Sequence, residues 1–98
     1  KVLASVETDD VPISLLLDEQ ARRVYVTNRG GVRVAKGEGT LSVFDAETLS
    51  LLQTVPLPPH PNSLALDRAN QALFVTVKND GDATKANTPE SVVRIGLK

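Results

Sequence analysis

Basic side chains are concentrated in one stretch of the sequence. Between Glu19 and Glu38 the chain has no carboxylate and five cations: Arg22, Arg23, Arg29, Arg33 and Lys36. Guanidinium groups form paired hydrogen bonds to phosphate or carboxylate oxygens. The stretch therefore predicts a site for nucleic acid or another polyanion. The alternative is a solvated loop whose charges keep the protein soluble.

The chain contains one histidine, His60, within the proline-rich segment PLPPHPNS. A histidine can act as a metal ligand or a general base. No cysteine and no cluster of residues with metal-ligand spacing accompanies it. We therefore expect no metal, no cofactor and no catalytic residue. The predicted ligand-binding set is Asn28, Arg29, Arg33, Lys36, His60 and Asn62.

The two halves of the sequence are copies of each other. At an offset of 49 residues, five of the positions between residues 12 and 18 meet identical residues in the second half. They are Pro12, Ser14, Leu15, Leu17 and Asp18, which meet Pro61, Ser63, Leu64, Leu66 and Asp67. The last stretch needs a larger offset, which aligns Leu41 with Val93 and Val43 with Ile95. One domain, 1–98, thus contains two repeats, 1–49 and 50–98.

Each repeat has four short apolar stretches that are separated by turn-forming residues. They read VLASV, PISLLL, RVYVTN and TLSVFD, then LLQTV, PNSLAL, LFVTV and VVRIGL. β-Branched enrichment and short length predict strands. The sequence thus predicts an all-β fold of two four-stranded antiparallel β-propeller blades. VLASV would be an outermost strand, and the second blade would lack one.

The motifs VYVTN (24–28) and GTLSVFD (39–45) resemble the YVTN repeat of the YncE-like seven-bladed propellers. HPNSLAL (60–66) and VVRIGL (92–97) are similar to the innermost and the C-terminal strands of that family. The resemblance implies that the chain forms the last two blades of a larger ring. It also implies a bacterial periplasmic or cell-surface setting. The other blades of the ring would come from the rest of a longer chain or, alternatively, from further copies of this chain.

The connectors predict where a ligand would bind. Strands of a meander alternate in direction, so the long connectors 7–11, 28–38, 56–62 and 78–90 should share one end of the blades. The tight turns that follow Asp18 and Asp67 should lie at the opposite end, with both carboxylates capping their turns. Long loops on a rigid scaffold commonly hold binding residues. We therefore expect the ligand at the long-connector end.

Overall composition excludes several classes of protein. The net charge of −1 gives no global attraction to nucleic acid, so such binding must be local. No apolar run reaches the length of a membrane span, and the opening residues do not form a signal peptide.

The leading hypothesis is a non-catalytic ligand-binding or scaffold module that binds single-stranded nucleic acid or another polyanion. The alternatives are a propeller enzyme with its site in the central channel, such as a lactonase-like hydrolase or a metal-assisted oxidoreductase, and a structural cell-surface repeat.

Overall fold

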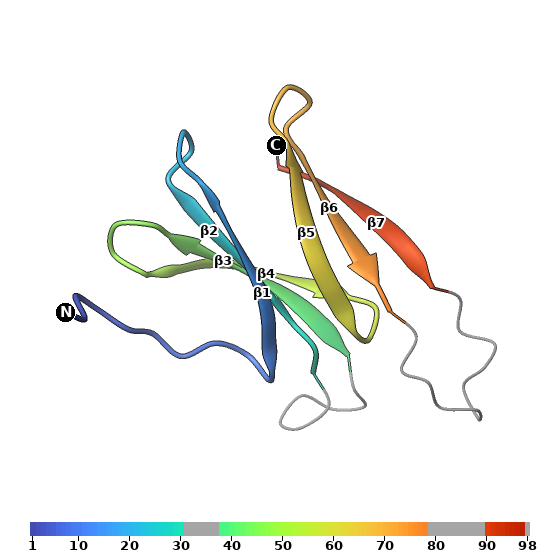
Figure 1. Ribbon diagram of the computed structural model, residues 1–98, viewed down its shortest axis with the longest axis horizontal. Coiled ribbons are helices and arrows are strands. Elements are labelled where there is room, and N and C mark those ends of the chain that lie inside the picture. The colour runs from blue at the N-terminus through green and yellow to red at the C-terminus, as the bar shows by residue number, and fades with distance from the viewer. Residues whose placement is uncertain (31–37, 79–89, 98) are drawn as a thin grey trace.

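The computed structural model describes residues 1–30, 38–78 and 90–97, and this part of the chain is all-β (Figure 1). Its strands form two antiparallel sheets. The first sheet contains β1 (Pro12–Asp18), β2 (Arg23–Asn28), β3 (Gly39–Asp45) and β4 (Leu51–Leu57). The second contains β5 (Pro61–Asp67), β6 (Ala72–Val77) and β7 (Ser91–Gly96). Each sheet is a meander in which consecutive strands are neighbours.

Aspartates end the strands and fix the tight turns. Oδ1 of Asp18 accepts hydrogen bonds from the amides of Gln20 and Ala21, at 3.1 and 3.2 Å. At the equivalent turn of the second sheet, Asp67 accepts one from the amide of Asn70 at 3.3 Å. Such side-chain caps replace the strand hydrogen bonds that the turn interrupts. The predicted capping role of both aspartates is confirmed.

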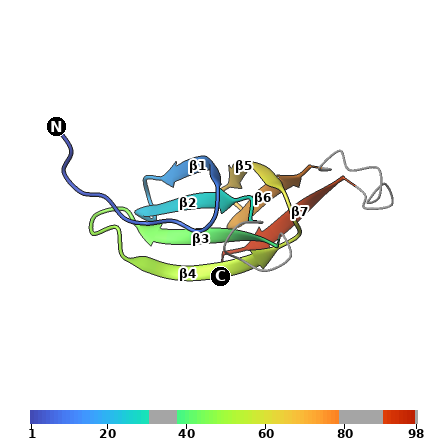
Figure 2. The same cartoon turned by 90° about the horizontal axis from the view of Figure 1, so that it is seen from below.

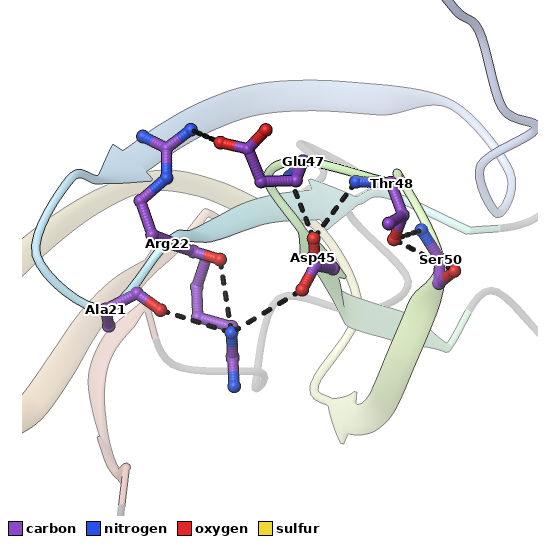
Figure 3. A network of polar contacts seen from close by, with 7 residues as sticks. Ala21, Arg22, Asp45, Glu47, Thr48 and Ser50 are labelled. Carbon is purple, nitrogen blue, oxygen red and sulfur yellow. Dashed lines mark hydrogen bonds and ion pairs between the residues drawn. The ribbon is translucent and has the colours of Figure 1, made fainter.

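The turn between β3 and β4 uses the same device (Figure 3). Oδ1 of Asp45 accepts hydrogen bonds from the amides of Glu47 and Thr48, at 2.8 and 3.0 Å. The bond from Thr48, followed by that from Glu47, lowers the pKa of Asp45 because both donors favour the charged carboxylate. Ser50 then continues the turn through its contacts with the Thr48 hydroxyl.

Both sheets are built on the same backbone pattern. The amide of Arg29 donates to the carbonyl of Val11, and the amide of Lys78 donates to the carbonyl of His60, each at 2.9 Å. Val11 and His60, which precede the first strands of the two sheets, both have left-handed backbones with φ of 54° and 62°. The two contacts are 49 residues apart, which is the offset at which the halves of the sequence align.

The third strand of each sheet corrects the predicted alignment. Thr27 lies opposite Leu41 in the first sheet, and its counterpart Thr76 lies opposite Val92 in the second. Leu41 therefore corresponds to Val92, not to Val93, and the offset at this strand is 51 residues. A shift of one residue moves every side chain to the opposite face of a strand. Val93 and Ile95 accordingly face the first sheet, whereas Arg94 is exposed.

The predicted first strand, VLASV (2–6), is not a strand. No described strand lies beside this segment, so its amides and carbonyls have no ladder partner, and Val2 and Leu3 are 85% and 86% exposed. The first sheet takes its outer strand, β4, from the second repeat. The second sheet has three described strands rather than four, and β7 lies at its edge.

The core lies between the two sheets. The first strands of the sheets, β1 and β5, lie side by side (Figure 2), and β5 also contacts β2. Leu41 of the first sheet and Leu73 and Val75 of the second are fully buried there. We call this packed boundary between the two sheets the seam. It determines which connectors of the two sheets lie next to each other.

Candidate functional site

The described parts of the long connectors meet at one end of the seam, as the sequence predicts. Nε of Arg29, the first residue after β2, donates a hydrogen bond to Nδ1 of His60 at 2.8 Å. His60 lies in the connector between β4 and β5, so this contact joins the two sheets. Because Nδ1 accepts the bond, the imidazole ring is neutral in this arrangement.

Arg29 differs from the arginines at the tight-turn end in the partner that holds it. Arg22 pairs with Glu47 at 2.6 Å and Arg68 pairs with Asp18 at 3.2 Å. Arg29 is exposed, and within the described ranges its one side-chain partner is the imidazole of His60. Its positive charge is therefore held in place without being neutralised by a described carboxylate.

The backbone around Arg29 is also fixed. Its amide bonds to the carbonyl of Val11, and the amide of Gly30 bonds to the carbonyl of Asp10 at 3.1 Å. The connector 7–11 therefore lies against the end of β2. On the other side, the His60 carbonyl is held by the amide of Lys78. Both partners of the Arg29–His60 contact thus start from an ordered backbone, which limits the entropy lost when a ligand binds.

Asn28 lies beneath this surface and is fully buried. Its Nδ2 donates to Oγ of Ser42 at 2.9 Å and to Oγ1 of Thr40 at 3.2 Å. Thr40 in turn donates to Oδ2 of Asp9 at 2.9 Å. This chain of bonds attaches the connector 7–11 to β2 and β3. Oδ1 of Asn28 has no partner in the described part of the chain.

The other predicted site residues are not part of this contact. Asn62 is exposed on β5 and lines a separate, shallow cavity with Thr76 and Lys78. Arg33 and Lys36 lie outside the described residues. Arg22 and Arg23 are at the tight-turn end, so the five cations of the sequence do not form one patch.

Thr40, Ser42 and Asp9 are residues that the sequence interpretation missed. A signal for the first two was present, because polar residues at alternate positions of a predicted strand share one face. Asp9 gave no such signal, since its contact with Thr40 joins segments that only the fold brings together.

Among the residues described, no group of three or more His, Cys, Asp or Glu side chains could hold a metal ion. The same residues include no helix long and apolar enough to cross a membrane.

These observations define an all-β repeat protein, with consecutive antiparallel sheets packed face to face like propeller blades. No protein-family model matches the chain. Over 86 residues it is 34% identical to YncE of Salmonella typhimurium strain LT2, a protein described as uncharacterized, and YncE of Salmonella typhi matches equally well. Each alignment covers 87% of this chain but 22% of the relative. The chain belongs to the YncE-like proteins and spans about a fifth of the length of these relatives.

Proposed function

We propose that the chain is a non-catalytic ligand-binding module that binds a polyanion, such as single-stranded nucleic acid, at its long-connector end. The observation that carries this proposal is the Arg29–His60 contact. A guanidinium group that is fixed by a neutral partner keeps its charge available for a phosphate. The periplasmic or cell-surface setting implied by the resemblance is part of the same proposal.

Two further features support a polyanion over a neutral ligand. Arg33 and Lys36 follow Arg29 in the same connector of the sequence, so additional charges are close along the chain. The arginines of the opposite end are paired with acids and offer less free charge. Because the whole chain has a net charge of −1, attraction must come from this local cluster and must weaken with salt.

The test is a binding titration with a fluorescently labelled single-stranded oligothymidylate, followed by anisotropy. We expect Arg29→Ala to weaken binding by roughly fivefold or more, because it removes a phosphate contact. His60→Ala should weaken it less, since the charge remains but loses its anchor. Arg22→Ala is the matched control: it removes the same charge at the tight-turn end and should leave affinity unchanged.

Inorganic polyphosphate as a competitor separates the two kinds of polyanion. Displacement of the oligonucleotide at equal phosphate concentration indicates recognition of phosphate groups alone. Retention of the oligonucleotide indicates that the bases also contribute. Equal affinities for the unmodified chain and the Arg29→Ala variant would refute the proposal in either case.

A further inference from the structure

A second polar cavity lies at the opposite end of the seam, between the tight turns of the two sheets. Its volume is about 400 Å³, within the range of roughly 300–1,000 Å³ that is usual for small-molecule sites. Arg23 lines it from the start of β2, and Arg68 lines it from the turn between β5 and β6. The cavity therefore depends on both sheets, as does the Arg29–His60 contact.

Both guanidinium groups are held in place by hydrogen bonds to neighbouring groups. Nη1 of Arg23 donates to the carbonyls of Ala21 and Arg22, each at 3.1 Å, and lies 4.0 Å from Oδ2 of Asp45. Nη2 of Arg68 donates to Oδ1 of Asp18 at 3.2 Å. Each arginine has further N–H donors beyond the one that anchors it.

The one carboxylate among the described lining residues is already occupied. Asp18 is buried, and its Oδ1 accepts from the amides of Gln20 and Ala21 as well as from Arg68. Among the described lining residues Arg23 and Arg68 outnumber Asp18, and Asp45, which lies 4.0 Å from Arg23, is outside the lining. The lining itself therefore has more positive than negative side chains, which favours an anionic ligand.

The remaining lining residues suit a molecule with one polar and one apolar end. Tyr25 lines the cavity, and burial, followed by the nearby Asp18 carboxylate, raises the pKa of its hydroxyl from the ordinary value. The hydroxyl therefore stays protonated near neutral pH and can donate a hydrogen bond. Leu66 and Leu97 supply an apolar wall.

From this lining we infer that the cavity binds a small organic monocarboxylate, with its carboxylate against Arg23, Arg68 and Tyr25 and its apolar body against Leu66 and Leu97. Paired N–H donors of arginine match the two oxygens of a carboxylate. The bound molecule would bridge the two sheets. This site is independent of the polyanion site, which lies at the other end of the seam.

Benzoate, which combines a carboxylate with an apolar ring, is a suitable probe, and benzamide is its neutral counterpart of the same shape. In a ¹H–¹⁵N NMR titration we expect benzoate to shift the amides of Gln20, Ala21, Gln71 and Leu97 in a saturable manner. Benzamide should shift them at least about tenfold more weakly, because it carries no charge for the arginines.

Two variants test whether benzoate binding depends on the lining residues. Arg23→Gln should weaken benzoate binding about tenfold, and Tyr25→Phe should weaken it severalfold while keeping the packed ring. Arg22→Gln, at the neighbouring arginine that pairs with Glu47, should leave it unchanged, as should Arg29→Ala at the other end of the seam. Equal shifts by benzoate and benzamide, or unaltered benzoate binding in both lining variants, would overturn the inference.

Discussion

At the scale of single residues, the arginines at the two ends of the seam differ in their hydrogen-bond and ion-pair partners. Arginines at the tight-turn end pair with acids, whereas Arg29 rests on a neutral imidazole. An exposed ion pair contributes about 0–1 kcal/mol to stability, so the exposed Arg22–Glu47 pair does little for the fold. The distinction matters for binding, since a charge without a competing carboxylate is more available to a ligand than one that already has an acidic partner.

Asp45 should make the stability of the β3–β4 turn depend on pH. Its pKa is lower in the folded chain than the ordinary value of 3.8, because the amides of Thr48 and Glu47 stabilise the carboxylate. Its contribution is therefore present above pH 3.8 and is lost as the pH falls below that value. The difference in thermal midpoint between the unmodified chain and Asp45→Asn should shrink between pH 6 and pH 3. A difference that stays constant over this range would contradict the account.

At the scale of elements, the close approach of β3 to the connector between β4 and β5 holds His60 in position. A Cβ on Gly39, the first residue of β3, would lie 2.5 Å from Cδ of Pro61 and 2.6 Å from the carbonyl oxygen of Pro58. Only a residue without a side chain allows this contact. The glycine is thus required by packing and not by its backbone conformation.

Gly39→Ala should consequently destabilise the fold, by about 1–3 kcal/mol if the connector can shift. It should also weaken polyanion binding, because the connector that moves contains His60. Gly96→Ala is the control, since no atom lies within 4 Å of the added Cβ, and it should leave stability equal or slightly higher. Urea unfolding measures both variants. Equal midpoints for the two would show that the contact at Gly39 is unimportant.

At the scale of the whole molecule, most of the fold could be predicted from the sequence. Seven of the eight predicted strands form: most of them contain β-branched residues, and each pairs with a neighbouring strand of its sheet. VLASV has the same local preference but no neighbouring strand, and a strand is stable only when its backbone is paired. The shift at the third strand was missed because similar apolar residues, Val92 and Val93, fit either register.

The candidate site was less predictable than the fold. The sequence correctly indicates that the described ends of the long connectors lie at one end of the sheets, since strand direction alone determines this. It does not indicate that Arg29 would meet His60, or that Thr40 would link Asn28 to Asp9. Those contacts join segments 12 to 31 residues apart and depend on how the sheets and connectors pack.

The salt dependence of oligonucleotide binding tests the proposed function most directly. Each phosphate contact on a single strand contributes about −0.7 to the slope of log K against log salt concentration. We predict that Arg29→Gln makes the slope shallower by about 0.7, while Arg22→Gln, which removes the same charge at the other end of the seam, leaves it unchanged. Identical slopes for the unmodified chain and the Arg29→Gln variant would contradict a polyanion site built on the Arg29–His60 contact.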